Sequence, residues 1–148
     1  MEKTFVRVRS VKDILIFASL IIIGSVLVAV PSGAPLNITG FFLVFAGIIL
    51  ALVLKSGYKE TESGVKYLKK ERYFQQAMNA AISTAIANKP ESVDLSQEDK
   101  GNAIRLDVYY SASANKAYVQ LFEYIPYRYE PCSKMYEYEI SRVAKLIK

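Results

Sequence analysis

The chain has 148 residues, a formal charge of +5 at pH 7, no histidine, no tryptophan and a single cysteine, Cys132. This composition excludes a disulfide within the chain, and it excludes zinc or haem sites built on histidine or on paired cysteines. Because the commonest general base is missing and no phosphate-binding loop, dinucleotide fingerprint or metal-ligand cluster occurs, we predict a protein that is not an enzyme and that uses neither a cofactor nor a metal.

Two uncharged apolar segments, residues 14–30 and 36–54, lie close together near the N-terminus. The first would span ~26 Å as a helix, and the second has the normal length for a hydrocarbon core of ~30 Å. The loop at 31–35 is so short that the two helices must run antiparallel. We therefore predict that residues 1–55 form an N-terminal tail and a transmembrane helical hairpin. A signal peptide is the alternative, and the second spanning segment that follows directly argues against it.

Positive charges flank the two segments, whereas the loop between them has none. The positive-inside rule then places both termini in the cytoplasm. We expect Lys69, Lys70 and Arg72, which follow the second segment, to lie at the membrane surface and to contact anionic lipid headgroups.

Small residues recur four positions apart in both segments, Ser25 and Ala29 in the first and Gly47 and Ala51 in the second. This spacing lets helix backbones approach closely, either within one hairpin or between subunits. We favour packing within the hairpin. Neither span contains an ionisable residue, which argues against a proton relay or a transporter site.

Residues 56–148 predict a small cytosolic α+β domain with the element order helix, strand, strand, helix. Apolar residues recur at three- and four-residue steps over 67–86, which predicts one amphipathic helix that ends before Pro90. Residues 91–101 are acidic and turn-like, with 92–95 as a candidate short strand.

Two stretches in which polar and apolar residues alternate, 104–110 and 118–125, predict the strands of a β-hairpin with a polar turn at 111–116. Pro131 fits the first turn of a final helix. The apolar stripe of that helix would consist of Cys132, Tyr136, Ile140, Val143 and Ile147.

Tyrosine is the unusual residue of this domain, since all eleven tyrosines follow residue 57. A tyrosine ring can stack on a nucleobase, while arginine and lysine neutralise phosphates. Core packing and a subunit interface are competing explanations of the same residues. The candidate ligand-binding residues are Arg105, Tyr109, Lys116, Tyr127, Arg128 and Lys134.

The domain is nearly neutral, with fourteen cations and twelve acids in residues 56–148. Its charge therefore does not indicate duplex nucleic acid as a partner, because such proteins neutralise many phosphates with clustered cations.

The layout resembles the small membrane effectors of type III CRISPR antiviral defence, which pair an N-terminal two-helix membrane hairpin with a compact cytosolic sensor for cyclic oligoadenylate. The likeness rests on the spans 14–30 and 36–54, the basic junction and the tyrosine-rich α+β module, and it covers nearly the full length. It implies a homo-oligomer, such as a tetramer, whose cytosolic domains bind the cyclic oligonucleotide cyclic tetra-adenylate. Binding would then trigger disruption or depolarisation of the lipid bilayer, which the resemblance implies is the bacterial inner (cell) membrane.

Two other functions stay open. A membrane-anchored adaptor or accessory subunit would use its tyrosine surface to bind a protein partner. A holin-like lesion former would share the hairpin and the charged tail, although it needs no structured domain of this size.

Overall fold

The computed structural model describes residues 2–31, 33–98 and 103–148, and the chain divides into two compact units. One unit is Arg7–Tyr58, and the other combines Met1–Val6 with Lys59–Lys148. The first few residues of the chain thus belong to the same unit as its C-terminal part, and not to the unit that contains the apolar segments.

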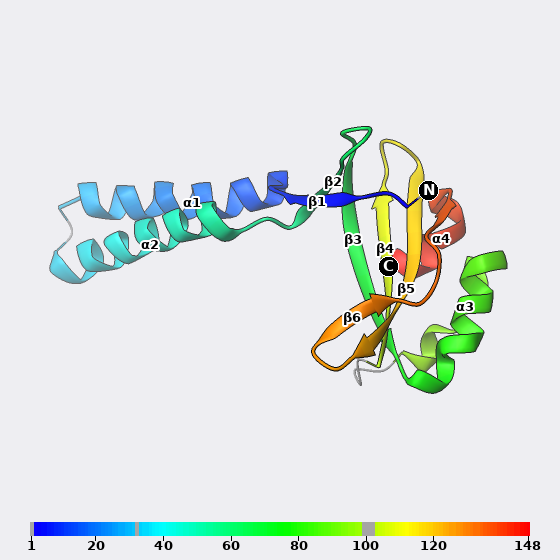
Figure 1. The fold of residues 1–148 in the computed structure, drawn as a ribbon. Coiled ribbons are helices and arrows are strands. Elements are labelled where there is room, and N and C mark those ends of the chain that lie inside the picture. The colour runs from blue at the N-terminus through cyan, green and yellow to red at the C-terminus, as the bar shows by residue number, and fades with distance from the viewer. Residues whose placement is uncertain (1, 32, 99–102) are drawn as a thin grey trace. The chain divides into compact units, whose positions relative to one another are not determined.

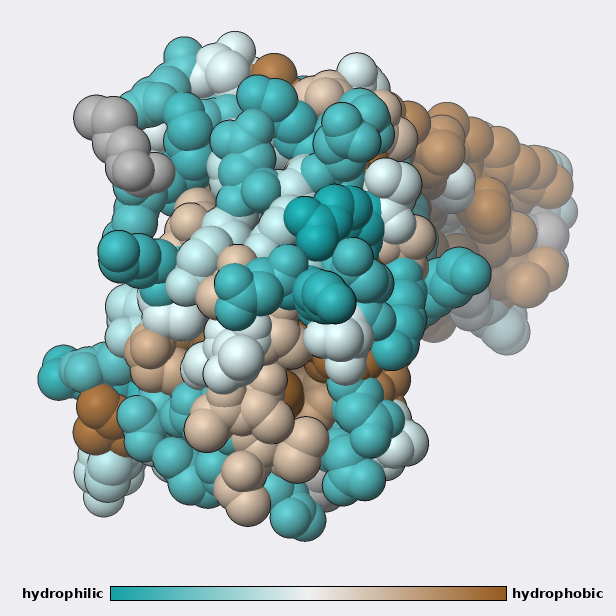
Figure 2. Space-filling model, turned by 90° about the vertical axis from the view of Figure 1, so that its right-hand side faces the viewer, coloured by the Kyte–Doolittle hydropathy of each residue, from teal (hydrophilic) through white to brown (hydrophobic). Residues whose placement is uncertain are grey.

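The unit Arg7–Tyr58 contains two antiparallel helices, α1 (Val11–Ala29) and α2 (Ala34–Val53), as the apolar segments predict (Figure 1). Both helices are long and apolar enough to span a membrane. α1 begins where Ser10 and Asp13 form a capping box, and α2 has a proline in its first turn. Many large apolar side chains of the hairpin are exposed, and the part of the hairpin visible in Figure 2 is mainly hydrophobic.

Three glycines let the two helices pack closely. A Cβ atom on Gly24 would lie 2.6 Å from the Gly40 carbonyl oxygen, and one on Gly40 would lie 2.7 Å from the Gly24 carbonyl oxygen. A Cβ atom on Gly47 would lie 3.0 Å from a carbonyl oxygen of α1. The close approach of the helices therefore uses Gly47 in α2, as predicted. In α1 it uses Gly24, whereas the predicted residues Ser25 and Ala29 are exposed.

Asp13 joins the two open ends of the hairpin. Its carboxylate accepts hydrogen bonds from the N–H groups of Ser10 (2.9 Å) and Ser56 (2.7 Å), and from the Ser56 hydroxyl (2.6 Å). A carboxylate that is only 2 % exposed needs such partners, because an unpaired buried charge is costly. Asp13 therefore fixes the residue before α1 to the residues after α2.

The other unit is built on a sheet that has seven strands within the described residues, in the order β1-β2-β3-β4-β5-β6, with β7 paired to β5. The pairs β3–β4, β4–β5, β5–β6 and β5–β7 are antiparallel. The strands are β1 (Phe5–Val8), β2 (Gly57–Glu60), β3 (Lys66–Phe74), β4 (Ile104–Ser111), β5 (Lys116–Ile125), β6 (Arg128–Pro131) and β7 (Tyr136–Tyr138).

Two helices, α3 (Asn79–Asn88) and α4 (Ile140–Ile147), lie on the same side of this sheet (Figure 1). Short 3₁₀ turns, η1 (Gln76–Met78), η2 (Pro90–Ser92) and η3 (Leu95–Gln97), occur in the chain between β3 and β4. Alternate residues of β4 and β5, such as Leu106, Val108 and Val119, point toward the helices and form the core with Ile82, Ile86, Val143 and Leu146. Figure 2, which views the domain from the helix side, shows a mainly hydrophilic surface with a paler zone where α3 lies.

The predicted helix over 67–86 is correct only in its second half, because residues Lys66–Phe74 form strand β3. β3 pairs with β4 from Leu68↔Tyr110 to Phe74↔Ile104. Tyr67 and Phe74 are both buried, and their spacing of seven fits a helical stripe as well as opposite faces of a strand. Pairing with β4 favours the strand over the helix for this segment, and tertiary contacts commonly override local preference in this way.

The predicted strands over 104–110 and 118–125 are confirmed as β4 and β5. The final helix is shorter than predicted, because Pro131 ends β6 and the helix begins only at Ile140. Between them the Cys132 N–H donates to the Leu121 carbonyl, and β7 pairs with β5. The candidate strand at 92–95 is wrong, since this stretch contains 3₁₀ turns, and residues 99–101 of the predicted acidic turn lie outside the described residues.

Candidate ligand site on the sheet

The face of the sheet that points away from α3 and α4 carries aromatic and charged side chains. Strand alternation places Tyr67 and Lys69 of β3 on it, with Tyr109 of β4 and Tyr118 and Gln120 of β5. This face divides into an aromatic cluster, an ionic cluster and a polar pocket.

The aromatic cluster includes a residue from the N-terminal segment. The ring of Phe5 stacks on Tyr109 with centroids 4.1 Å apart and planes at 4°, and it meets Tyr67 edge-on at 5.2 Å. Tyr118 lies 5.8 Å from both Phe5 and Tyr67. Burial raises the pKa of the Tyr67 and Tyr118 hydroxyls, so both stay neutral at physiological pH. The cluster fixes the segment before α1 onto the sheet.

The ionic cluster surrounds Asp107, which is only 1 % exposed. Its carboxylate lies 3.2 Å from Lys69 Nζ and 2.8 Å from Arg105 Nε. The Arg105 guanidinium also lies over the rings of Phe122 (4.8 Å) and Tyr129 (4.5 Å). Burial raises the pKa of Asp107, and the two cations oppose that rise. The cluster is a structural ion-pair network, because each of its charges lies beside a group of opposite charge.

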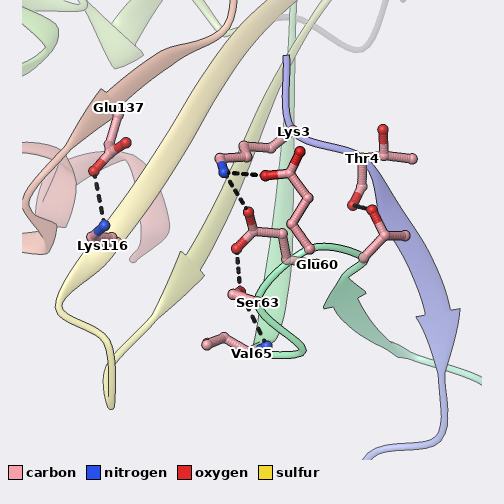
Figure 3. A network of polar contacts seen from close by, with 9 residues as sticks. Lys3, Thr4, Glu60, Ser63, Val65, Lys116 and Glu137 are labelled. Carbon is pink, nitrogen blue, oxygen red and sulfur yellow. Dashed lines mark hydrogen bonds and ion pairs between the residues drawn. The ribbon is translucent and has the colours of Figure 1, made fainter. Parts of the chain in front are cut away.

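The polar pocket has a volume of about 210 Å³. The Lys3 ammonium lies 3.0 Å from the Glu60 carboxylate (Figure 3). It also lies 2.6 Å from the carboxylate of Glu62. The Ser63 hydroxyl donates to Glu60 (2.5 Å), and across the pocket Lys116 pairs with Glu137 at 3.2 Å. The lining residues are Lys3, Glu60, Ser63, Val65, Tyr67, Ala114, Lys116, Tyr118 and Glu137.

The electrostatics of the pocket favour the charged form of its acid and its base. The hydrogen bond from Ser63 lowers the pKa of Glu60, against the effect of burial, and the Lys3 ammonium lowers it further. Hydrogen bonds to Glu62 and Glu60 raise the pKa of Lys3. The Lys3 ammonium and the Glu60 carboxylate are therefore both charged at neutral pH.

The walls of the pocket come from distant parts of the chain. Lys3 precedes α1, whereas Glu60 and Ser63 follow α2. Lys116 begins β5, and Glu137 belongs to β7. Both segments that connect the sheet domain to the hairpin thus contribute to one pocket.

The structure does not bring the six predicted ligand-binding residues together, because only Lys116 lines the pocket. Arg105 lies in the ionic cluster and Tyr109 in the aromatic cluster. Tyr127 and Arg128 lie at the exposed turn between β5 and β6, and Lys134 is exposed between β6 and β7. Sequence reasoning missed Lys3 and Glu60, which no local pattern connects.

The three predicted membrane-surface residues also lie apart. Lys69 is part of the ionic cluster, where burial lowers its pKa but Glu71 and Asp107 raise it to about 12. Lys70 is half-buried on β3. Arg72 is buried, and its guanidinium donates to the carbonyl oxygens of Leu146 (2.7 Å) and Lys148 (2.5 Å) at the end of α4. Arg72 therefore serves as a C-terminal cap of α4, which is not the surface position predicted for it.

Within the described residues, no group of three or more histidine, cysteine, aspartate or glutamate side chains is arranged to hold a metal ion. Comparison of the chain with protein-family models, curated proteins and solved structures gives no match.

Proposed function

We propose that the chain is a membrane-anchored sensor and effector. Its hairpin spans the bacterial inner membrane, its sheet domain lies in the cytoplasm with both termini, and the polar pocket binds an anionic second messenger of the cyclic oligoadenylate class. Occupancy of the pocket then changes the hairpin and disturbs the membrane. The protein thus binds its ligand and responds by a conformational change, without catalysis.

The place of the N-terminal segment supports a two-span topology. Residues Met1–Val6 are part of the sheet domain, where the Thr61 N–H donates to the Thr4 carbonyl (3.0 Å) and Phe5 completes the aromatic cluster. A segment built into the domain must lie on the same side of a membrane as the domain. Two spans satisfy this requirement. A cleaved signal peptide would instead remove Lys3 and Phe5 from the fold.

The observation that carries the proposal is that the pocket includes residues from both connections to the hairpin. The Lys3 ammonium bridges to Glu60 and Glu62, which lie beyond α2. A phosphate that takes Lys3 as its partner would break this bridge, since a phosphate competes well for an ammonium. Ligand binding would thereby separate the segment before α1 from the segment after α2.

The size of the pocket restricts how a large cyclic ligand can bind. A volume of about 210 Å³ is below the ~300–1,000 Å³ of pockets that enclose whole drug-sized ligands. One pocket would therefore take a single nucleotide unit. A ring of four units would need a symmetric tetramer, in which each subunit contributes Lys3 and Lys116.

Binding of cyclic tetra-adenylate to the full-length protein in lipid nanodiscs, measured by calorimetry, tests the ligand. Lys116→Ala should weaken binding roughly ten- to a hundred-fold, because a charge-assisted contact contributes ~1.5–3 kcal/mol. Lys134→Ala removes an exposed lysine outside the pocket and serves as the matched control, with unchanged affinity expected. Absence of binding by the native protein, or equal losses in both variants, would refute the ligand assignment.

A labelling experiment tests the topology separately. Cys132 is exposed and is the one cysteine of the sequence. A membrane-impermeant maleimide should leave Cys132 unlabelled in intact cells and label it after lysis. An Ala34→Cys variant in a Cys132→Ser background places the thiol at the exposed start of α2, beside the loop that is predicted to be external, and it should react in intact cells. The reverse pattern would reject the cytoplasmic placement.

A further inference from the structure

The β5–β6 turn lies at one end of the sheet domain (Figure 1), and its apolar and aromatic side chains are exposed. Tyr127 is 98 % exposed, Tyr124 is 50 % exposed and Ile125 is 37 % exposed, and Pro126 is exposed between them. The neighbouring Arg128 is 72 % exposed and pairs with Glu130. We name this turn, residues 124–128, the tyrosine tip.

The backbone conformation of Tyr127 indicates that a tyrosine at this position does not stabilise the fold. Tyr127 has a φ of 72°, in the left-handed region that glycine and asparagine adopt easily and that is unfavourable for a bulky residue. Pro126 precedes it, as in a type II turn whose next position usually holds glycine. A ring that is almost fully exposed returns no packing energy for this strain. Strained positions of this kind cluster at functional sites.

We infer that the tyrosine tip inserts into the interfacial region of the lipid bilayer, between the headgroups and the acyl chains. This inference rests on the membrane anchoring proposed above. Tyrosine suits that region because its ring is apolar and its hydroxyl remains hydrated. Ile125 and Pro126 add apolar surface, and Arg128 can exchange Glu130 for a lipid phosphate.

The tether favours lipid over a soluble partner. Only residues 54–56 separate the end of α2 from β2, so an embedded hairpin holds the domain at the membrane. Such a connection gives an effective local concentration of about millimolar for any surface that can reach the bilayer. A weak interfacial contact, too weak to recruit a free protein, is then sufficient to orient the tethered domain.

The absence of tryptophan from the sequence gives a direct test. Three full-length variants each carry one tryptophan: Tyr127→Trp at the tip, Phe42→Trp on the exposed surface of α2, and Lys89→Trp at the exposed end of α3. Each is reconstituted into vesicles of equal parts phosphatidylcholine and phosphatidylglycerol, with and without bromine on the acyl chains. Quenching by brominated lipid and the emission wavelength report contact with the bilayer.

The tryptophan at position 127 should be quenched at least two-fold by brominated lipid and emit at shorter wavelength than the one at position 89. The tryptophan at position 42 should be quenched whatever the tip does. Quenching at position 42 without quenching at position 127 would overturn the inference about the tip and leave the membrane anchoring intact. A tip that binds a protein partner would give this result. Failure of quenching at both positions would reject the anchoring itself.

A Tyr127→Gly variant separates binding from folding. Glycine removes the unfavourable φ, so the thermal unfolding midpoint should stay the same or rise. The same variant should weaken the membrane contact of the tip. This is measured as faster hydrogen–deuterium exchange of the backbone amides of residues 124–129 when the protein is reconstituted in vesicles. A lower midpoint together with unchanged protection would show that Tyr127 serves the fold and would overturn the inference.

Discussion

The packing of Phe5 against the sheet gives the sharpest test of how the N-terminal segment is held. Phe5 contacts Tyr67, Tyr109 and Tyr118, and its side chain is half-buried. Replacement of a fully buried phenylalanine by alanine costs ~3–5 kcal/mol. Half-burial reduces this to about 2 kcal/mol, which includes the aromatic pair geometry at ~0.5–1.5 kcal/mol per pair.

The assay is thermal unfolding of the full-length Phe5→Ala protein in detergent micelles, followed by the near-ultraviolet circular dichroism of the tyrosines. For a domain of this size, 1 kcal/mol shifts the midpoint by ~4–8 °C, so a decrease of about 10 °C is expected. Val6→Ala on the same strand is the matched control, because Val6 is exposed and its truncation should shift the midpoint by about 4 °C or less. Equal effects of the two substitutions would refute the claim that the N-terminal segment is an integral part of the sheet domain.

Two further predictions concern the hairpin and the pocket. Gly40→Val should separate α1 from α2, because its Cβ would lie 2.7 Å from the Gly24 carbonyl oxygen. We expect a loss of ~1–3 kcal/mol, read as reduced crosslinking between cysteines placed on the two helices. Ala46→Val adds a similar side chain at an exposed position of the same helix and should not change the crosslinking. Glu60 has a pKa below its ordinary value of 4.5, so its stabilising effect is complete above that value and is lost as the pH falls through the depressed pKa. Glu60→Gln should therefore make the unfolding midpoint less sensitive to acid below pH 4.5, and an unchanged acid dependence would contradict the assigned role of Ser63 and Lys3.

The sequence was sufficient for the parts of the fold that are long and locally periodic. The two apolar helices and the strands β4 and β5 each extend over eight residues or more, so their patterns can be read without knowledge of their neighbours. The remaining strands were missed for physical reasons. β1, β2, β6 and β7 have only three or four residues each, too few to show alternation.

Strand β3 was misread for a different reason. Its central residues are charged and typical of helices, yet they are stabilised by contacts that only the tertiary structure supplies. Lys69 pairs with Asp107, and Arg72 caps the end of α4. The same limit applies to the pocket, since Lys3 and Glu60 are brought together only because the hairpin is inserted between β1 and β2.

The short connections between the two units explain why an oligomer fits the proposed function better than a monomer. Two residues separate β1 from α1 and three separate α2 from β2, so any signal from the pocket reaches the helices through these segments. A ligand can shift a conformational equilibrium only by its difference in affinity for the two states, and a nearly complete switch needs ~10⁴-fold. One small pocket with a single exchanged ion pair supplies about ten-fold, or ~1.4 kcal/mol. Four equivalent pockets that bind one symmetric ligand multiply to ~10⁴-fold, so the tetramer implied by the resemblance would supply the free energy that a single subunit lacks.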